Sequence, residues 1–269
     1  MLRRAALAVA LTLWAVPLAA NERVERLTRA LHLQDVIAIL VEEGLEQSRA
    51  LDDTFLNGQG GSLLQTRIDG LYDPDWMTGE MTEAFEKYMT DAQLEQAAIF
   101  FESDLGQTII SLENSARRAF SDEAVEEVAR ATYDTADRDD PFYRLIDEYI
   151  RLNDLVDLNV KSTLSSDYNF YLGLSEGHGT RAEIDLLLSN LLEQREASKA
   201  ETTIWLYSFL MLAYHPLSEA DMRENIAFSR TETGRALNRA LFDGFDAMYD
   251  SISFQLGLAI AQAMNASDL

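Results

Sequence analysis

The chain has 269 residues and no cysteine, and its 46 acidic and 22 basic side chains give a formal net charge of −24. This excess of acid excludes nucleic acid and anionic lipid surfaces as partners, because both attract basic patches. The lack of cysteine excludes disulfides and thiol chemistry, so stability must come from packing.

The first twenty residues have the layout of a secretory signal peptide. A basic pair, Arg3 and Arg4, precedes an apolar run from Ala5 to Val16, and small residues follow up to Ala20. About a dozen apolar residues fall short of the roughly 20 that a membrane-spanning helix needs. We therefore expect cleavage after Ala20, a periplasmic or secreted protein, and no stable membrane span once the signal is removed.

Apolar side chains then recur at helical spacing. They predict a short helix over 24–31 and a second over 36–45, with a break at 33–35. Residues 53–61, rich in Asn and Gly, predict a loop, and a further helix is expected over roughly 75–87.

One stretch, residues 89–112, occurs again in divergent form 128 residues later, as residues 217–240. Both copies open with a hydroxyl residue followed three positions later by a residue that completes a capping box: Thr90 with Gln93, and Ser218 with Asp221. Ser103 is expected to cap the next helix, which continues to Ala119.

Both copies keep a phenylalanine, a hydroxyl and a glycine in register: Phe100, Ser103 and Gly106, then Phe228, Thr231 and Gly234. A glycine near the start of a helix costs up to about 1 kcal/mol relative to alanine, so its recurrence predicts close backbone approach at a tight corner. We interpret Gly106 and Gly234 as packing residues rather than ligand contacts.

Residues 134–140 are the clearest linker, and Asp140 with Pro141 predicts the N-cap and first residue of a new helix. The first half then reappears at an offset of 119, which pairs Asp35 with Asp154 and Gly58 with Gly177. The predicted organisation is therefore a signal peptide at 1–20, a helical repeat at 21–133, the linker, and a second repeat at 141–269.

The segment Ile204–Tyr214 is apolar on every side except Ser208, which predicts a buried helix. It is either the central core helix, the interpretation we favour, or a surface that meets a partner or an apolar ligand. Leu237 to Ile252 follow core spacing, and the apolar tail 254–264 is expected to pack beside that last helix.

The phrase from Ile99 to Gly106, apolar-Phe-Phe-x-Ser-x-x-Gly after an opening Thr and acid, resembles the bacterial envelope family catalogued as domain of unknown function 2059. The first copy matches at Phe100, Phe101, Ser103 and Gly106, whereas the second has Ser229 and Thr231 in place of the second aromatic and the serine. The resemblance implies an exported all-helical domain, present here twice. It supplies no reaction, ligand or catalytic residue.

The sharpest enzyme pattern is Gly173-Leu174-Ser175-Glu176-Gly177, which fits the G-x-S-x-G nucleophile elbow of α/β-hydrolases. A helix opened by Thr180 with Glu183 would follow it, and Asp185 and His215 stand in the hydrolase order. An elbow needs a parallel sheet, and the chain shows no alternation of strands with helices. We therefore interpret the pattern as a glycine-rich loop between helices.

No metal or phosphate site is predicted. His32, His178 and His215 lack the spacing that places two ligands on one helix face. The acidic groups at 122–127 and 137–140 lack the EF-hand spacing and are interpreted as a solvated face and a linker.

The sequence thus predicts an all-α protein, a helical bundle built from two tandem pseudo-repeats. We expect an exported, non-catalytic binding or interaction protein of the cell envelope, with no catalytic residue, cofactor or metal, whose partner is an unknown envelope protein. The alternatives are an apolar small-ligand or lipid-binding protein and a serine hydrolase that uses Ser175.

Overall fold

In a computed structural model that describes residues 16–178 and 184–267, every regular element is an α-helix, which confirms the predicted fold class. The helices are α1 (Val16–Ala30), α2 (Leu33–Leu56), α3 (Gly61–Leu71), α4 (Pro74–Tyr88), α5 (Asp91–Phe101), α6 (Asp104–Phe120), α7 (Glu123–Asp134), α8 (Pro141–Leu152), α9 (Leu155–Gly177), α10 (Ile184–Tyr214), α11 (Glu219–Ser229) and α12 (Glu232–Ser267).

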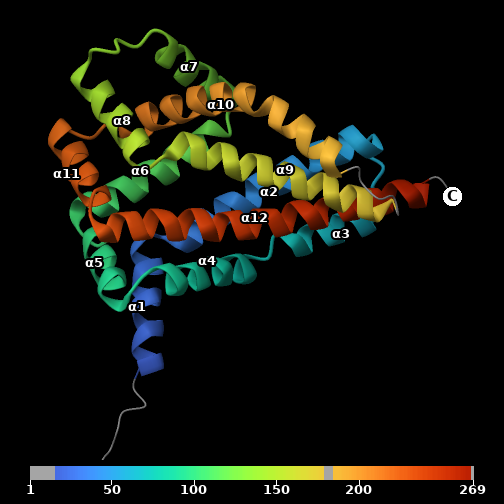
Figure 1. The fold of residues 1–269 in the computed structure, drawn as a ribbon, viewed down its shortest axis with the longest axis horizontal. Coiled ribbons are helices and arrows are strands. Elements are labelled where there is room, and N and C mark those ends of the chain that lie inside the picture. The colour runs from blue at the N-terminus through green and yellow to red at the C-terminus, as the bar shows by residue number, and fades with distance from the viewer. Residues whose placement is uncertain (1–15, 179–183, 268–269) are drawn as a thin grey trace, which may run out of the picture.

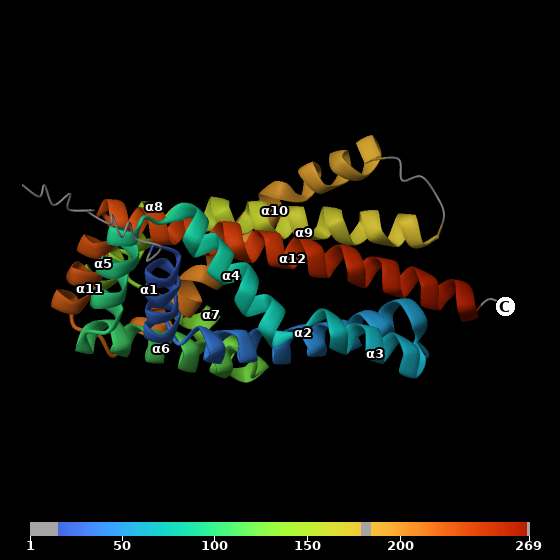
Figure 2. The ribbon, with the colours of Figure 1, turned by 90° about the horizontal axis from the view of Figure 1, so that it is seen from below.

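Helices α9 and α12 lie side by side along the long axis of the molecule (Figure 1). On one side α10 packs on α9, and on the other α4 and α3 pack on α12 (Figure 2). The short helices α5 and α11 lie together at one end, where α1 packs against α5.

Two hydrophobic cores stabilise this arrangement, and neither is built from one half of the chain alone. The first joins α1 to α5 with α12, through buried residues such as Leu27, Phe85 and Met248. The second joins α8, α10 and α11 with α6, through residues such as Ile146 and Ile109. Helix α12 therefore contributes to the first core, although it lies at the C-terminal end of the chain, and α6 contributes to the second core as well as to the first.

The local signals in the sequence fold as they predict. Both capping boxes are present, Thr90 with Gln93 at α5 and Ser218 with Asp221 at α11. The Ser103 hydroxyl accepts a hydrogen bond from the Gly106 amide at 3.1 Å and so caps α6. Asp140 caps α8, and Pro141 is its first residue.

The two glycine corners confirm the packing role of these glycines. A Cβ on Gly106 would lie 2.3 Å from the Phe100 carbonyl oxygen, and one on Gly234 would lie 2.3 Å from that of Phe228. The two corners also contact each other, because the rings of Phe100 and Phe228 stack with centroids 4.0 Å apart and planes 6° apart.

The boundary between the first two helices differs from the expectation. The first break falls at Leu31 and His32, two residues early, because His32 adopts the left-handed conformation that turns the chain. Asp154 does the same before α9, and these corner residues are 122 positions apart. The expected offset of 119 pairs Asp154 with Asp35 rather than with His32.

The expected loop at 53–61 is shorter than predicted. Helix α2 continues to Leu56, and only residues 57–60 form the turn, in which Asn57 and Gly58 have positive φ. The Asp52 carboxylate accepts a hydrogen bond from the Gly60 amide at 3.0 Å and so closes this turn.

Two predictions about the second half are wrong for one reason, the crossing of α9 and α12. The expected glycine-rich loop at 173–177 is helical, and the tail 254–264 extends α12 instead of packing beside it. A Cβ on Gly173 would lie 2.0 Å from the Phe254 carbonyl oxygen, and one on Gly257 would lie 2.0 Å from that of Phe170. The glycines let the two backbones touch.

Candidate functional site

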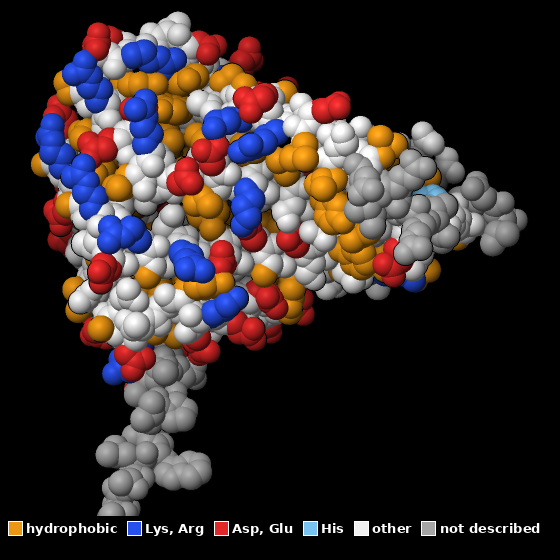
Figure 3. All heavy atoms as spheres, in the orientation of Figure 1, with side chains coloured by type: hydrophobic (Ala, Val, Ile, Leu, Met, Phe, Trp, Pro, Cys, Tyr) orange, Lys and Arg blue, Asp and Glu red, His pale blue; other side chains and the backbone are white. Residues whose placement is uncertain are grey.

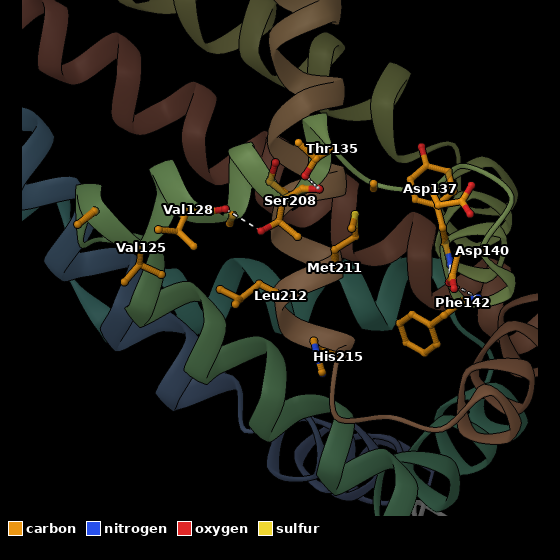
Figure 4. A pocket seen from close by; sticks show the side chains of 15 residues that line it. Val125, Val128, Thr135, Asp137, Asp140, Phe142, Ser208, Met211, Leu212 and His215 are labelled. Carbon is orange, nitrogen blue, oxygen red and sulfur yellow. Dashed lines mark hydrogen bonds between the residues drawn. The ribbon is translucent and has the colours of Figure 1, made fainter.

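An apolar groove with a volume of about 830 Å³ lies between α7 and α10 (Figure 4). Its lining comes from α7, from the C-terminal end of α10, and from the segment that leads into α8. We call it the α7–α10 groove. It is lined by Ala124, Val125, Val128, Ala129, Thr132, Thr135, Ala136, Asp137, Asp140, Phe142, Tyr143, Ser208, Met211, Leu212 and His215.

Helix α7 forms one wall. Asp122 caps it by accepting a hydrogen bond from the Ala124 amide at 2.9 Å. Arg130 ties it to α10, since its guanidinium lies 2.6 Å from the Glu201 carboxylate and 2.7 Å from that of Glu126. Val128, held on this wall, is 66% exposed. A large apolar side chain is thus kept in water beside a cavity.

The C-terminal end of α10 forms the other wall. Leu206, Leu210 and Tyr214 are buried, which confirms the prediction of a core helix over 204–214. Met211 and Leu212 turn instead toward the groove, and Leu212 is 38% exposed. The segment 204–214 is therefore core on one face and accessible apolar surface on another, so it combines the two alternatives that the sequence offers.

Hydroxyl groups in the groove already have partners. Ser208 donates to the Ile204 carbonyl at 2.7 Å, and Thr132 donates to that of Val128 at 2.8 Å. Since these donors are satisfied within their helices, the walls offer methyl and thioether groups to an occupant. The groove can recognise apolar shape far better than it can recognise a polar ligand.

One end of the groove is acidic. Asp137 and Asp140 line it where the linker passes into α8 (Figure 4). The same side chains stabilise local turns, because Asp137 accepts from the Asp139 amide at 2.9 Å and Asp140 from the Phe142 amide at 2.8 Å. The site thus combines an apolar surface with a negative rim.

A second exposed apolar surface lies on the first turns of α10, which stand away from α9 and α12 in Figure 2. Leu186, Leu188 and Leu192 are exposed there, and Leu191 is buried.

The structure does not form the nucleophile elbow suggested by Gly173 to Gly177. Ser175 lies inside helix α9, and both glycines pack against α12. His215 belongs to the α7–α10 groove, beyond the end of α10. Thr180 and Glu183 lie outside the described residues, as does the side chain of Asp185. A strained strand-to-helix turn, which the elbow requires, is absent at this place.

The three histidines lie in separate parts of the fold. His32 at the α1–α2 corner hydrogen-bonds Gln107 Oε1 at 2.8 Å, and His178 Nδ1 lies 2.8 Å from the Leu174 carbonyl oxygen. Within 16–178 and 184–267, no group of three or more His, Asp or Glu side chains is placed to hold a metal ion.

One buried polar cluster was not foreseen. The Tyr214 hydroxyl donates a hydrogen bond to the Glu113 carboxylate, so α10 and α6 are joined across the second core. Burial raises the pKa of the Glu113 carboxyl, although the hydrogen bond from Tyr214 opposes the shift. Its charged form is therefore unfavourable in the folded state.

Sequence reasoning also missed the part that α7 plays. Val125, Val128, Ala129 and Thr132 follow helical spacing, which was the available signal. Their partners on α10 are about 80 residues away, and no local pattern shows that the two faces would meet across a cavity.

In the part of the chain that the structure describes, no helix is long and apolar enough to cross a membrane. No curated protein and no solved structure matches the chain. Residues 75–133, which run from α4 to α7 and include the first glycine corner and one wall of the groove, match the model of a family described as an uncharacterized protein conserved in bacteria, DUF2059.

Proposed function

We propose that this protein is exported to the cell envelope and acts there as a non-catalytic binding protein. Its α7–α10 groove would receive an amphipathic helix of a partner protein, with basic residues beside its apolar face. The observation that carries this proposal is the pair of exposed apolar side chains, Val128 and Leu212, that face one cavity from opposite walls.

The dimensions of the groove suit a short helix. Helix α7 has 12 residues, and at a rise of about 1.5 Å per residue it is roughly 18 Å long. A partner helix of about three turns would lie along it and place apolar residues on the groove at i, i+3, i+4 and i+7. Burial of one large aliphatic side chain contributes about 1.5–3 kcal/mol, so two such contacts support a measurable affinity.

Charge favours a basic partner. The rim carries Asp137 and Asp140, the first turn of α7 adds Glu123, and the whole chain has a formal net charge of −24. Such a field speeds the approach of a cationic segment and disfavours an acidic one. The same charge supported the expectation that nucleic acid is not a partner.

We also infer that the chain consists of two divergent tandem copies of one helical unit. The supporting observations are the capping boxes at α5 and α11 and the glycine corners at Gly106 and Gly234, which have the same geometry. Export rests on the sequence of residues 1–20 alone.

The proposal is tested by titrating the mature protein with two fluorescent model peptides that share one apolar helical face. One carries lysine and the other carries glutamate at the flanking positions. We expect the basic peptide to bind and its affinity to fall as salt is raised, because exposed charges are screened within about 10 Å at 0.1 M. Val128→Asn with Leu212→Asn should weaken binding by at least about tenfold.

Ile99→Asn is the matched control, because Ile99 is an exposed apolar residue on α5 and lies outside the groove. The proposal is wrong if both peptides bind alike, or if the groove variant and the control bind equally well. Catalytic turnover of an ester, peptide or glycoside that one point change abolishes would also contradict it.

Cross-linking in cells of the native host then identifies the partner. A photo-reactive residue at position 212 should capture a protein whose linked peptide is a basic amphipathic segment, and one at position 99 should not. A lipid that co-purifies with the protein and is displaced from the groove by Leu212→Trp would show that an apolar small ligand is the occupant instead.

A further inference from the structure

Another cavity, of about 410 Å³, also borders the linker, and its lining is polar and basic where that of the α7–α10 groove is apolar. Three tyrosines and three arginines line it: Tyr133, Tyr143, Tyr207, Arg138, Arg144 and Arg151. They come from the end of α7, the linker, α8 and α10. We call it the tyrosine–arginine pocket.

The tyrosines form a fixed wall. Tyr143 stacks on Tyr207 with centroids 5.5 Å apart and planes 19° apart, and Tyr133 lies 5.3 Å from Tyr207. Tyr207 is buried, and its hydroxyl donates to Asp147 Oδ1 at 2.5 Å. Because the central ring is held by packing and by a hydrogen bond, the wall has little freedom to lose when a ligand binds.

Arg138 lies over this wall. Its guanidinium carbon is 4.1 Å from the centroid of the Tyr133 ring and 4.7 Å from that of Tyr143. In the described residues no carboxylate forms an ion pair with it. The ring faces hold the cation, while its N–H donors lie in the guanidinium plane and suit a bidentate contact with an oxyanion.

Arg144 and Arg151 also line the pocket with Arg138, and each forms an exposed ion pair. Arg144 pairs with Asp139 at 2.5 Å and Arg151 with Asp147 at 3.1 Å, but their side chains are 64% and 77% exposed. Exposed ion pairs contribute little free energy, so these arginines can turn to a ligand at small cost.

The balance of charge in the pocket is unusual for this protein. Its lining has three arginines and one carboxylate, that of Asp147, in a chain whose formal net charge is −24. Lys and Arg side chains also gather over α8 and α11 on the face shown in Figure 3. With Asp139, which pairs with Arg144 from outside the lining, three arginines still face two carboxylates, so an anion would meet a favourable local field there.

We propose that the tyrosine–arginine pocket binds a small solute through a carboxylate or phosphate group, with Arg138 as its bidentate partner. The cavity volume suits a small molecule rather than a folded partner. This site is distinct from the α7–α10 groove and does not depend on its occupant, although Tyr143 lines both cavities.

The test is calorimetric titration of the mature protein with inorganic phosphate and with succinate at low ionic strength, with chloride as the monovalent control. We expect saturable binding of phosphate, of succinate, or of both, and the tighter one names the group that the site prefers. Arg138→Gln should weaken it by about tenfold or more, and Arg144→Gln and Arg151→Gln by a few-fold each.

Two variants distinguish specific anion binding at Arg138 from non-specific attraction by surface charge. Arg138→Lys keeps the charge but loses the fork, so it should also weaken binding. Arg223→Gln is the control, because Arg223 is 59% exposed and forms an i,i+4 pair with Glu219 on α11, as Arg151 does with Asp147 on α8. Absence of saturable binding, or equal affinities for Arg138→Gln and Arg223→Gln, would overturn the proposal.

Discussion

Replacement of Gly173 by alanine tests the close backbone approach between α9 and α12. The new Cβ would lie 2.0 Å from the Phe254 carbonyl oxygen, against roughly 3.5 Å for a relaxed contact, so α9 and α12 must separate by about 1.5 Å. Overpacking of this kind costs about 1–3 kcal/mol, and a backbone atom cannot rotate aside as a side chain can. We therefore expect an overpacking cost of about 3 kcal/mol, the upper end of this range.

Alanine also favours the helix by about 1 kcal/mol relative to glycine, which leaves a net loss of about 2 kcal/mol. For a chain of this size the melting temperature should fall by about 4–8 °C. Gly257→Ala should act alike, since its Cβ would meet the Phe170 carbonyl oxygen at 2.0 Å. The double variant should lose less than the sum of the two single losses, because one separation of the helices accommodates both methyl groups.

Urea unfolding followed by circular dichroism at the helix band gives these free energies. Gly79→Ala in α4 is the matched control, because no heavy atom lies within 4 Å of its added Cβ. The control should gain about 1 kcal/mol from helix propensity alone. If Gly173→Ala were as stable as Gly79→Ala, the backbone contact between α9 and α12 would not exist in solution.

Three further experiments test other interior features. Gly106→Leu and Gly234→Leu should each lower the free energy of unfolding by about 3 kcal/mol, measured by urea unfolding, since both side chains would meet a carbonyl oxygen; wild-type stability would refute their packing role. A double-mutant cycle of Phe100→Leu and Phe228→Leu should give a coupling of about 0.5–1.5 kcal/mol, and additivity would exclude a contribution from the ring stack. Burial raises the folded-state pKa of Glu113, so its contribution to stability is full below its unfolded pKa and is lost as pH rises through the folded value. Unfolding free energies measured across that window should decline with pH in the wild type and decline less in Glu113→Gln; identical pH profiles would contradict the assigned shift.

Local chemistry in the sequence predicted the features that a few neighbouring residues determine. The capping box at Thr90, the cap at Ser103 and the start of α8 at Asp140 each depend on side chains within three positions. The glycine corners were also predictable, because the two similar stretches 89–112 and 217–240 both keep the glycine, which indicates a shared constraint.

Features that depend on distant partners were predicted poorly. Gly173 and Gly177 looked like loop residues, because glycine is frequent in loops and their partner helix begins more than fifty residues later. The α7–α10 groove and the tyrosine–arginine pocket are likewise lined by residues that are distant in the sequence and meet only in the fold. In the groove, Val128 and Leu212 are an example. The apolar run 204–214 predicts a buried helix, yet Leu212 in it is partly exposed. Hydrophobic spacing does not indicate where a cavity interrupts the packing.

Helix α12 belongs to the first core, and α6 contributes to the second. This arrangement affects the order in which the protein acquires its structure. A chain that has emerged only as far as the linker holds α1 to α5 without the buried residues of α12 that complete their core, among them Met248, Ile252 and Ile260. Its α6 meanwhile exposes Ile109 and Ala116 to water, since α8, α10 and α11 have not yet appeared. The second core closes only when α11 has emerged, and the first only when α12 arrives, so the chain remains open to chaperones and proteases during most of its synthesis.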